Sequence, residues 1–136
     1  MAFLYHSTRG NLVPGNEYLP AGAIVVDIGK LLYMNDGVLA VAAGTTMPTY
    51  VCVQKGPEGA VTSGTIIAVN RIDTETVFAT TWSAAASGVS AGDRVTISAD
   101  GMEVTATTGG PAEVVAFDGT TVGDRVYVRF PAHAAE

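Results

Sequence analysis

The side chains best suited to covalent chemistry in this sequence are two histidines and one cysteine. His6 lies near the N-terminus and His133 near the C-terminus, and neither stands beside a carboxylate or a second ligand at metal-binding spacing. Cys52 is flanked by valines, where a thiol without a basic neighbour behaves as a small apolar side chain. A single cysteine also excludes an internal disulfide. We therefore expect neither a nucleophile nor a metal centre.

The carboxylates follow a pattern that is typical of turns. Catalysis by a general acid and a general base requires two carboxylates brought together in a cleft, and nothing in the sequence requires that arrangement. The sequence also lacks the phosphate-binding glycine-rich loops, the nucleophile elbow and the EF-hand spacing. We therefore expect no enzyme activity and no cofactor. The carboxylates that neighbour glycine, as turn caps do, are Asp93, Asp100, Asp118 and Asp124.

The elements that would position any site are predicted to be short β-strands. Ten runs rich in Val, Ile, Thr and Tyr recur from residue 21 onward and are separated by Gly, Asp, Asn or Pro. This spacing is typical of a single antiparallel β-barrel or β-sandwich, and the sequence leaves the choice open. The only helix candidate is the stretch 82–87, with two turns at most. The ten runs are 24–28, 31–34, 38–41, 50–54, 65–72, 76–80, 94–98, 102–107, 113–117 and 124–130.

Turn signals and alternation support the strand assignment. Asp36-Gly37 and Asp100-Gly101 each separate two apolar runs and predict hairpins. Near the C-terminus, period two places the apolar residues of 126–130 on one face, while Arg125, Tyr127 and Arg129 share the other, which is either solvated exterior or a subunit contact. Along 66–72 both faces are apolar, which indicates a central strand.

One tetrapeptide occurs twice. Gly-Asp-Arg-Val stands at 92–95 and again at 123–126, an offset of 31 residues (123 − 92). Glycine permits the tight turn, aspartate caps it, and Arg-Val begins an alternating strand. Two copies are too few for a solenoid. We interpret them as one type of loop-to-strand entry used twice in one barrel.

Composition limits the classes of partner. The 136 residues contain 7 Lys and Arg against 13 Asp and Glu, which gives a net charge of −6 and argues against binding to nucleic acid or an anionic membrane. Only 15% of residues are charged while 48% are hydrophobic, which indicates either an exterior that partly contacts another protein or simply a compact domain rich in Ala, Gly and Thr. No apolar run is long enough for a transmembrane helix. The N-terminus lacks the positive region of a signal peptide, so we expect none.

Three segments are expected: an N-terminal arm at 1–20, a β-domain at 21–131 and a C-terminal tail at 132–136. The arm combines turn formers with large apolar side chains, which favours docking on its own subunit, a sister subunit or a foreign surface. The only tryptophan either belongs to an interface or fills the edge of the core. The predicted interface residues are Phe3, Leu4, Tyr5, Tyr18 and Trp82.

The segments 89–97, 100–107 and 122–130, with the arm before them, resemble the small accessory head proteins of tailed bacteriophages, which decorate or cement the capsid. The closer likeness covers about the last 50 residues. It implies a non-catalytic protein on the exterior of the virion, assembled in the host cytoplasm. It also implies a trimer, with the major capsid protein as partner and an arm that helps to bind the shell.

Two other classes remain open on the sequence. The first is a carbohydrate- or peptide-binding β-module of a phage fibre or cell surface, for which the aromatic residues, 7% of the chain, are few and dispersed. The second is a small hydrolase, which lacks an evident nucleophile–base pair.

Overall fold

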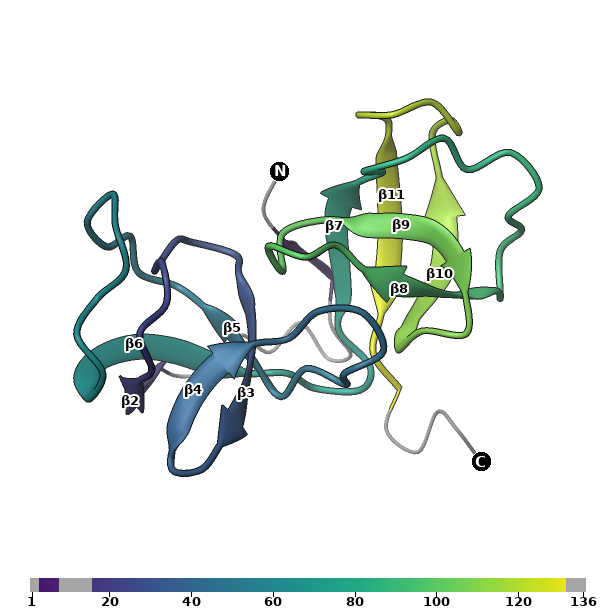
Figure 1. Ribbon diagram of the computed structural model, residues 1–136. Helices are drawn as coiled ribbons and strands as arrows, with labels where there is room; N and C mark the ends of the chain where they lie inside the picture. The colour runs from purple at the N-terminus through teal and green to yellow at the C-terminus, as the bar shows by residue number, and fades with distance from the viewer. Residues whose placement is uncertain (1–2, 8–15, 132–136) are drawn as a thin grey trace.

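The computed structural model describes residues 3–7 and 16–131, and no residue in these ranges is helical. The predicted all-β class is therefore confirmed. Eleven strands form two sheets in the described part of the chain (Figure 1). One sheet contains β2 (Asn16–Ala21), β3 (Leu31–Asn35), β4 (Val38–Val41), β5 (Tyr50–Cys52) and β6 (Thr65–Arg71). The other contains β1 (Leu4–Ser7), β7 (Val77–Thr81), β8 (Arg94–Ile97), β9 (Val104–Thr108), β10 (Ala112–Phe117) and β11 (Arg125–Arg129).

The first sheet is a closed barrel in the order β2-β4-β3-β5-β6. β2 pairs antiparallel with β6 along its whole length and meets β4 in parallel at one pair, Ala21 with Leu39. β3 and β4 form the hairpin predicted at Asp36-Gly37, where φ is +52° and +84°. Positive φ at both central residues matches the twist of a two-residue hairpin. Because few residue types other than Asp, Asn and Gly tolerate positive φ, the sequence Asp-Gly predicts this turn.

The second sheet also closes on itself. Its order is β1-β7-β11-β10-β8-β9, and a parallel bridge between Trp82 and Val104 brings the end of β7 back to β9. Five strands, β7 to β11, therefore make a second barrel, and β1 is added to the outer edge of β7. The two barrels lie side by side, with β2–β6 in purple to teal and β7–β11 in teal to yellow (Figure 1).

The two barrels have the same topology, with β2 to β6 corresponding in order to β7 to β11. Gly22 donates its main-chain N–H to Leu39 O at 2.8 Å, and in the second barrel Ser83 donates to Val104 O at the same distance. Three further main-chain bonds of the first barrel have an equivalent in the second. The bond from Gly64 N–H to Ala21 O corresponds to that from Gly123 N–H to Trp82 O, and the bond from Gly29 N–H to Cys52 O corresponds to that from Gly92 N–H to Val114 O. The bond from Cys52 N–H to Lys30 O corresponds to that from Val114 N–H to Asp93 O. The chain is therefore an internal structural repeat of two five-stranded barrels.

Four glycine turns introduce equivalent strands of this repeat. Gly29, Gly64, Gly92 and Gly123 have φ between +82° and +97°, a conformation that favours glycine, and they precede β3, β6, β8 and β11. The two Gly-Asp-Arg-Val copies are the turns of the second barrel, so their use twice in one barrel is confirmed. In the first barrel the same backbone carries different side chains.

Two apolar clusters hold the structure together. One fills the first barrel and includes Leu32 and Val69. The other fills the second barrel and extends to the outer face of the first, where it includes Leu31 and Val51. Because successive side chains of a strand point to opposite faces, β3 contributes Leu32 to one cluster and Leu31 to the other. Both faces of β3 are thus buried at its first two residues, where the barrels pack against each other.

Three sequence-based expectations need correction. The described parts of the predicted arm at 1–20, residues 3–7 and 16–20, are not outside the fold, because β1 joins the second sheet and β2 closes the first barrel. A domain of 21–131 alone would therefore lack a strand of the first barrel. The run 24–28 makes only an isolated bridge, between Val25 and Ala60, and the stretch 82–87 forms bends and a turn rather than a helix. The predicted tail, 132–136, and with it His133, lies outside the described residues.

Candidate interaction surface

Two of the five predicted interface residues are core residues instead. Phe3 is 2% exposed, and its ring lies 5.8 Å from that of Phe130. Trp82 is fully buried, and its indole Nε1–H donates a hydrogen bond to Gly119 O at 2.8 Å. The edge of its ring meets Phe117. Because packing within one chain already satisfies both aromatic side chains, neither is available to a partner.

Two of the predicted residues are exposed. Leu4 is 44% exposed in β1, and Tyr18 is 67% exposed in β2. The main chain of Tyr5 lies in β1, but its side chain is outside the described part of the structure, as is that of His6. The predicted set therefore leaves Leu4 and Tyr18 as surface residues, on different barrels.

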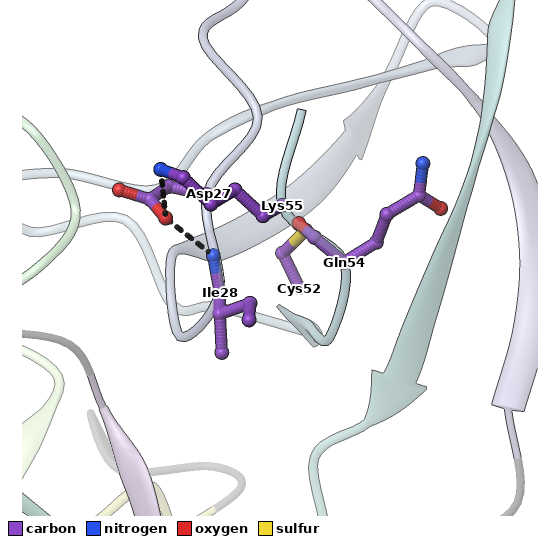
Figure 2. Close-up of polar contacts among 5 residues, drawn as sticks. All are labelled: Asp27, Ile28, Cys52, Gln54 and Lys55. Atoms are coloured by element: carbon purple, nitrogen blue, oxygen red, sulfur yellow. Dashed lines mark hydrogen bonds and ion pairs between the residues drawn. The ribbon is translucent and has the colours of Figure 1, made fainter. Parts of the chain in front are cut away.

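The thiol of Cys52 is buried inside the first barrel. Burial raises the pKa of this thiol, and its Sγ lies 3.1 Å from the carbonyl oxygen of Gln54 (Figure 2). The nearby Asp27 faces the exterior, accepts the N–H of Ile28 at 2.9 Å and lies 3.7 Å from Lys55 Nζ. A neutral, enclosed thiol is a poor nucleophile, so Cys52 contributes to packing.

Three of the four predicted turn carboxylates cap their turns. Asp93 accepts the N–H of Ser90 at 2.9 Å, Asp124 that of Thr121 at 3.0 Å, and Asp100 the N–H of Met102 at 3.0 Å. Within residues 3–7 and 16–131, no group of three His, Cys, Asp or Glu side chains is placed to hold a metal ion. The same residues include no helix long and apolar enough to cross a membrane.

An apolar row crosses the outer face of the second barrel. Leu4 stands opposite Ala79, Ala79 opposite Tyr127, and Tyr127 opposite Ala116. Directly opposite residues share a face of a sheet, so these four side chains run across β1, β7, β11 and β10. We call them the outer row. Leu4 and Ala116 are exposed, and Tyr127 is half-buried.

Two arginines flank the outer row on β11. Arg125 is exposed, and Arg129 donates a hydrogen bond from Nε to Glu113 on β10. The alternation of 125–130 predicted this face but left its role open. Leu4 was predicted as an interface residue, but its place in one row with Tyr127 and Ala116 was not predictable, because that place depends on strand pairing between distant segments.

A second apolar surface lies on the first barrel. Tyr18 stands opposite Ala68, and Pro20 stands opposite Ile66, so the four side chains lie on the outer face of β2 and β6. Ile66 is 56% exposed. We call Tyr18, Pro20 and Ile66 the β2 surface. The sequence showed that both faces of 66–72 are apolar, but only the barrel shows which face is outside.

Fold and surface thus define an all-β protein with two equivalent barrels and two exposed apolar surfaces. No protein-family model matches the chain, and no curated protein matches it.

Proposed function

We propose that this protein is a structural protein that binds the outside of a tailed-phage capsid and stabilises or decorates it without catalysis. The observation that carries the proposal is the outer row, in which Leu4 of β1, Tyr127 of β11 and Ala116 of β10 present apolar surface around the buried Ala79 of β7. The likeness of residues 89–130 to phage accessory head proteins supplies the class of partner, the major capsid protein.

The outer row has the chemistry of a protein-binding surface. Leu4 is nearly half exposed and Tyr127 half-buried, so a partner would remove apolar surface from water on contact. Arg125 beside the row provides a positive charge on a protein whose net charge is −6. A carboxylate of the partner facing Arg125 would add specificity and make binding sensitive to salt.

Cosedimentation with phage heads that lack the protein tests this proposal. The double variant Leu4→Asp with Ala116→Glu places two charges in the outer row at exposed positions, and we expect it to lose head binding while keeping its circular dichroism spectrum. The matched control is Val122→Asp, which changes an equally exposed apolar residue outside the row and should bind as the unmodified protein does.

Two outcomes would contradict the proposal. If the double variant binds heads as tightly as the control, the outer row is not the contact. If the unmodified protein does not bind heads but binds an immobilised glycan, a carbohydrate-binding module is the better assignment.

A further inference from the structure

One strand edge of the first barrel differs from its equivalent in the second barrel. In the second barrel, β1 covers the outer edge of β7, with Leu4 paired to Ala79. Ala79 lies three residues before Trp82, and its equivalent in the first barrel is Tyr18, three residues before Ala21. β4 meets β2 only at Ala21, and no other strand in the described ranges pairs with β2 on that side. The edge at Tyr18 is therefore open where its equivalent is covered.

The main chain of β2 presents hydrogen-bonding groups at this edge. Gly22 donates its N–H toward β4, to Leu39 O. Alternate residues of an extended strand point their N–H and C=O groups to the same side, so Pro20 and Tyr18 face the same edge as Gly22. Proline has no N–H and is tolerated at strand edges for that reason. Tyr18 thus offers one donor and one acceptor.

We propose that β2 of a second copy of this chain occupies the open edge, related by a two-fold axis at Tyr18. In this antiparallel pair the N–H of Tyr18 donates to the C=O of Tyr18 in the other copy, and the second copy returns the same bond. Glu17 of each copy then stands opposite Leu19 of the other. The first barrels of the two copies are then joined by one continuous sheet, in which β6 and β2 of one copy are followed by β2 and β6 of the other.

The edge is self-complementary, as a two-fold interface requires. The register places Tyr18, the most exposed large apolar side chain of the first barrel, directly opposite Tyr18 of the other copy, with Pro20 on the same outer face. It also keeps the carboxylates apart, because Glu17 faces a leucine of the partner and already lies 3.2 Å from Arg71 of its own chain. No like charges are opposed in this pair.

The occupant inferred here is a copy of the chain rather than a capsid segment, and the inference does not depend on the proposed function. A strand pair of this length buries little area, so the dimer is expected to be weak. Sedimentation equilibrium of the full chain, from about 1 to 500 micromolar, covers the range in which such interfaces form. The mass should rise with concentration from 13.9 kDa toward twice that value.

Variants at one position separate the main chain from the side chain. Tyr18→Pro removes the edge N–H from both copies, and we expect dimerisation to weaken at least about tenfold, since two hydrogen bonds are lost. Tyr18→Val keeps the N–H and should weaken dimerisation less. Tyr18→Asp keeps the N–H but places two carboxylates directly opposite each other at the axis, and it should also weaken dimerisation. Val122→Thr, on the second barrel, is the matched control and should dimerise as the unmodified chain does.

Each variant is also tested for folding by its urea midpoint, so that a loss of dimer in an unfolded variant is recognised. Tyr18→Asp tests the same interface if Tyr18→Pro fails to fold. A chain that stays monomeric at every concentration would overturn the inference. So would a dimer that Tyr18→Pro and Tyr18→Asp leave unchanged, or a mass of three chains, which the likeness to phage accessory proteins implies.

Discussion

Replacing Phe3 by alanine distinguishes a core residue from an interface anchor. The Phe3 ring is buried in the cluster of the second barrel, 5.8 Å from Phe130, which lies at the same distance from Phe78. Its main-chain N–H donates to Gly29 O at 3.0 Å, which also links the chain start to the first barrel. An anchor for a partner would leave the isolated protein unaffected when removed, whereas a core residue would not.

The expected loss follows from burial. Phe→Ala at a buried position costs about 3–5 kcal/mol of unfolding free energy, because apolar contacts are lost and a cavity remains. Leu4 is the adjacent residue and a matched control, since it lies on the opposite, exposed face of β1. Leu4→Ala should cost about 1 kcal/mol or less, because its side chain is only half removed from water.

Urea unfolding followed by far-ultraviolet circular dichroism measures both variants. For a small protein with an m-value of about 1–3 kcal/mol/M, the Phe3→Ala loss lowers the midpoint by at least about 1 M. Leu4→Ala should shift it by much less. If Phe3→Ala costs no more than Leu4→Ala, then Phe3 is not a core residue, and the segment before β2 is a docking arm after all.

Three further predictions concern the interior. Trp82→Phe keeps an aromatic ring but loses the hydrogen bond to Gly119 O, so it should cost about 1–3 kcal/mol in urea unfolding, and an unchanged midpoint would refute a structural role for the indole N–H. Gly110→Ala should lower the Tm sharply, because a Cβ there would lie 2.1 Å from Val95 O, and calorimetry showing no shift would contradict that close approach. Burial raises the pKa of the Cys52 thiol in the folded state above its value in the unfolded chain. The stabilisation that depends on the neutral thiol is therefore fully present below the unfolded-state pKa and is lost as the pH rises above 9.0. The urea midpoint should fall in that range, and Cys52→Ala should remove the fall that this thiol causes.

Local patterns predicted most of the strands. Val38–Val41 has the predicted bounds because its signal, a two-residue turn followed by four apolar residues, is contained within a few neighbouring positions. The inward and outward faces of 126–130 were also correct, since period two depends only on the extended backbone. The burial of Cys52 follows from its valine neighbours in the same way.

The strand at Asn16–Ala21 shows where local patterns were insufficient. Its six residues include Asn, Glu and Pro, which have low strand propensity, and they were assigned to an arm. Pairing with β6, which holds Glu17 beside Arg71 across 54 positions of sequence, makes them a strand. Tertiary contacts override propensity here because an entire barrel closes through this one element.

The predicted interface residues also fall into two groups, those at the surface and those in the core. Leu4 and Tyr18 were predicted as interface residues, since large apolar residues in the first positions of the chain stood out against its turn formers. The structure places both at the surface, and their contact with a partner stays a prediction. Trp82 and Phe3 were equally prominent, and only packing shows that the core already holds them.

The sequence by itself determined the all-β class, the turns and the alternation of faces, because each depends on contacts between residues close together in the chain. The tertiary structure alone decided the pairing of distant strands, the closure of two barrels and their equivalence. Ala21 and Trp82 occupy the same place in the two barrels, yet one side chain is a methyl group and the other an indole. Equivalent glycines stand at the turns, but main-chain hydrogen bonds define the repeat as a whole. Because nearly every residue can make those bonds, the side chains of the two barrels need not match, and the sequence shows little of the repeat.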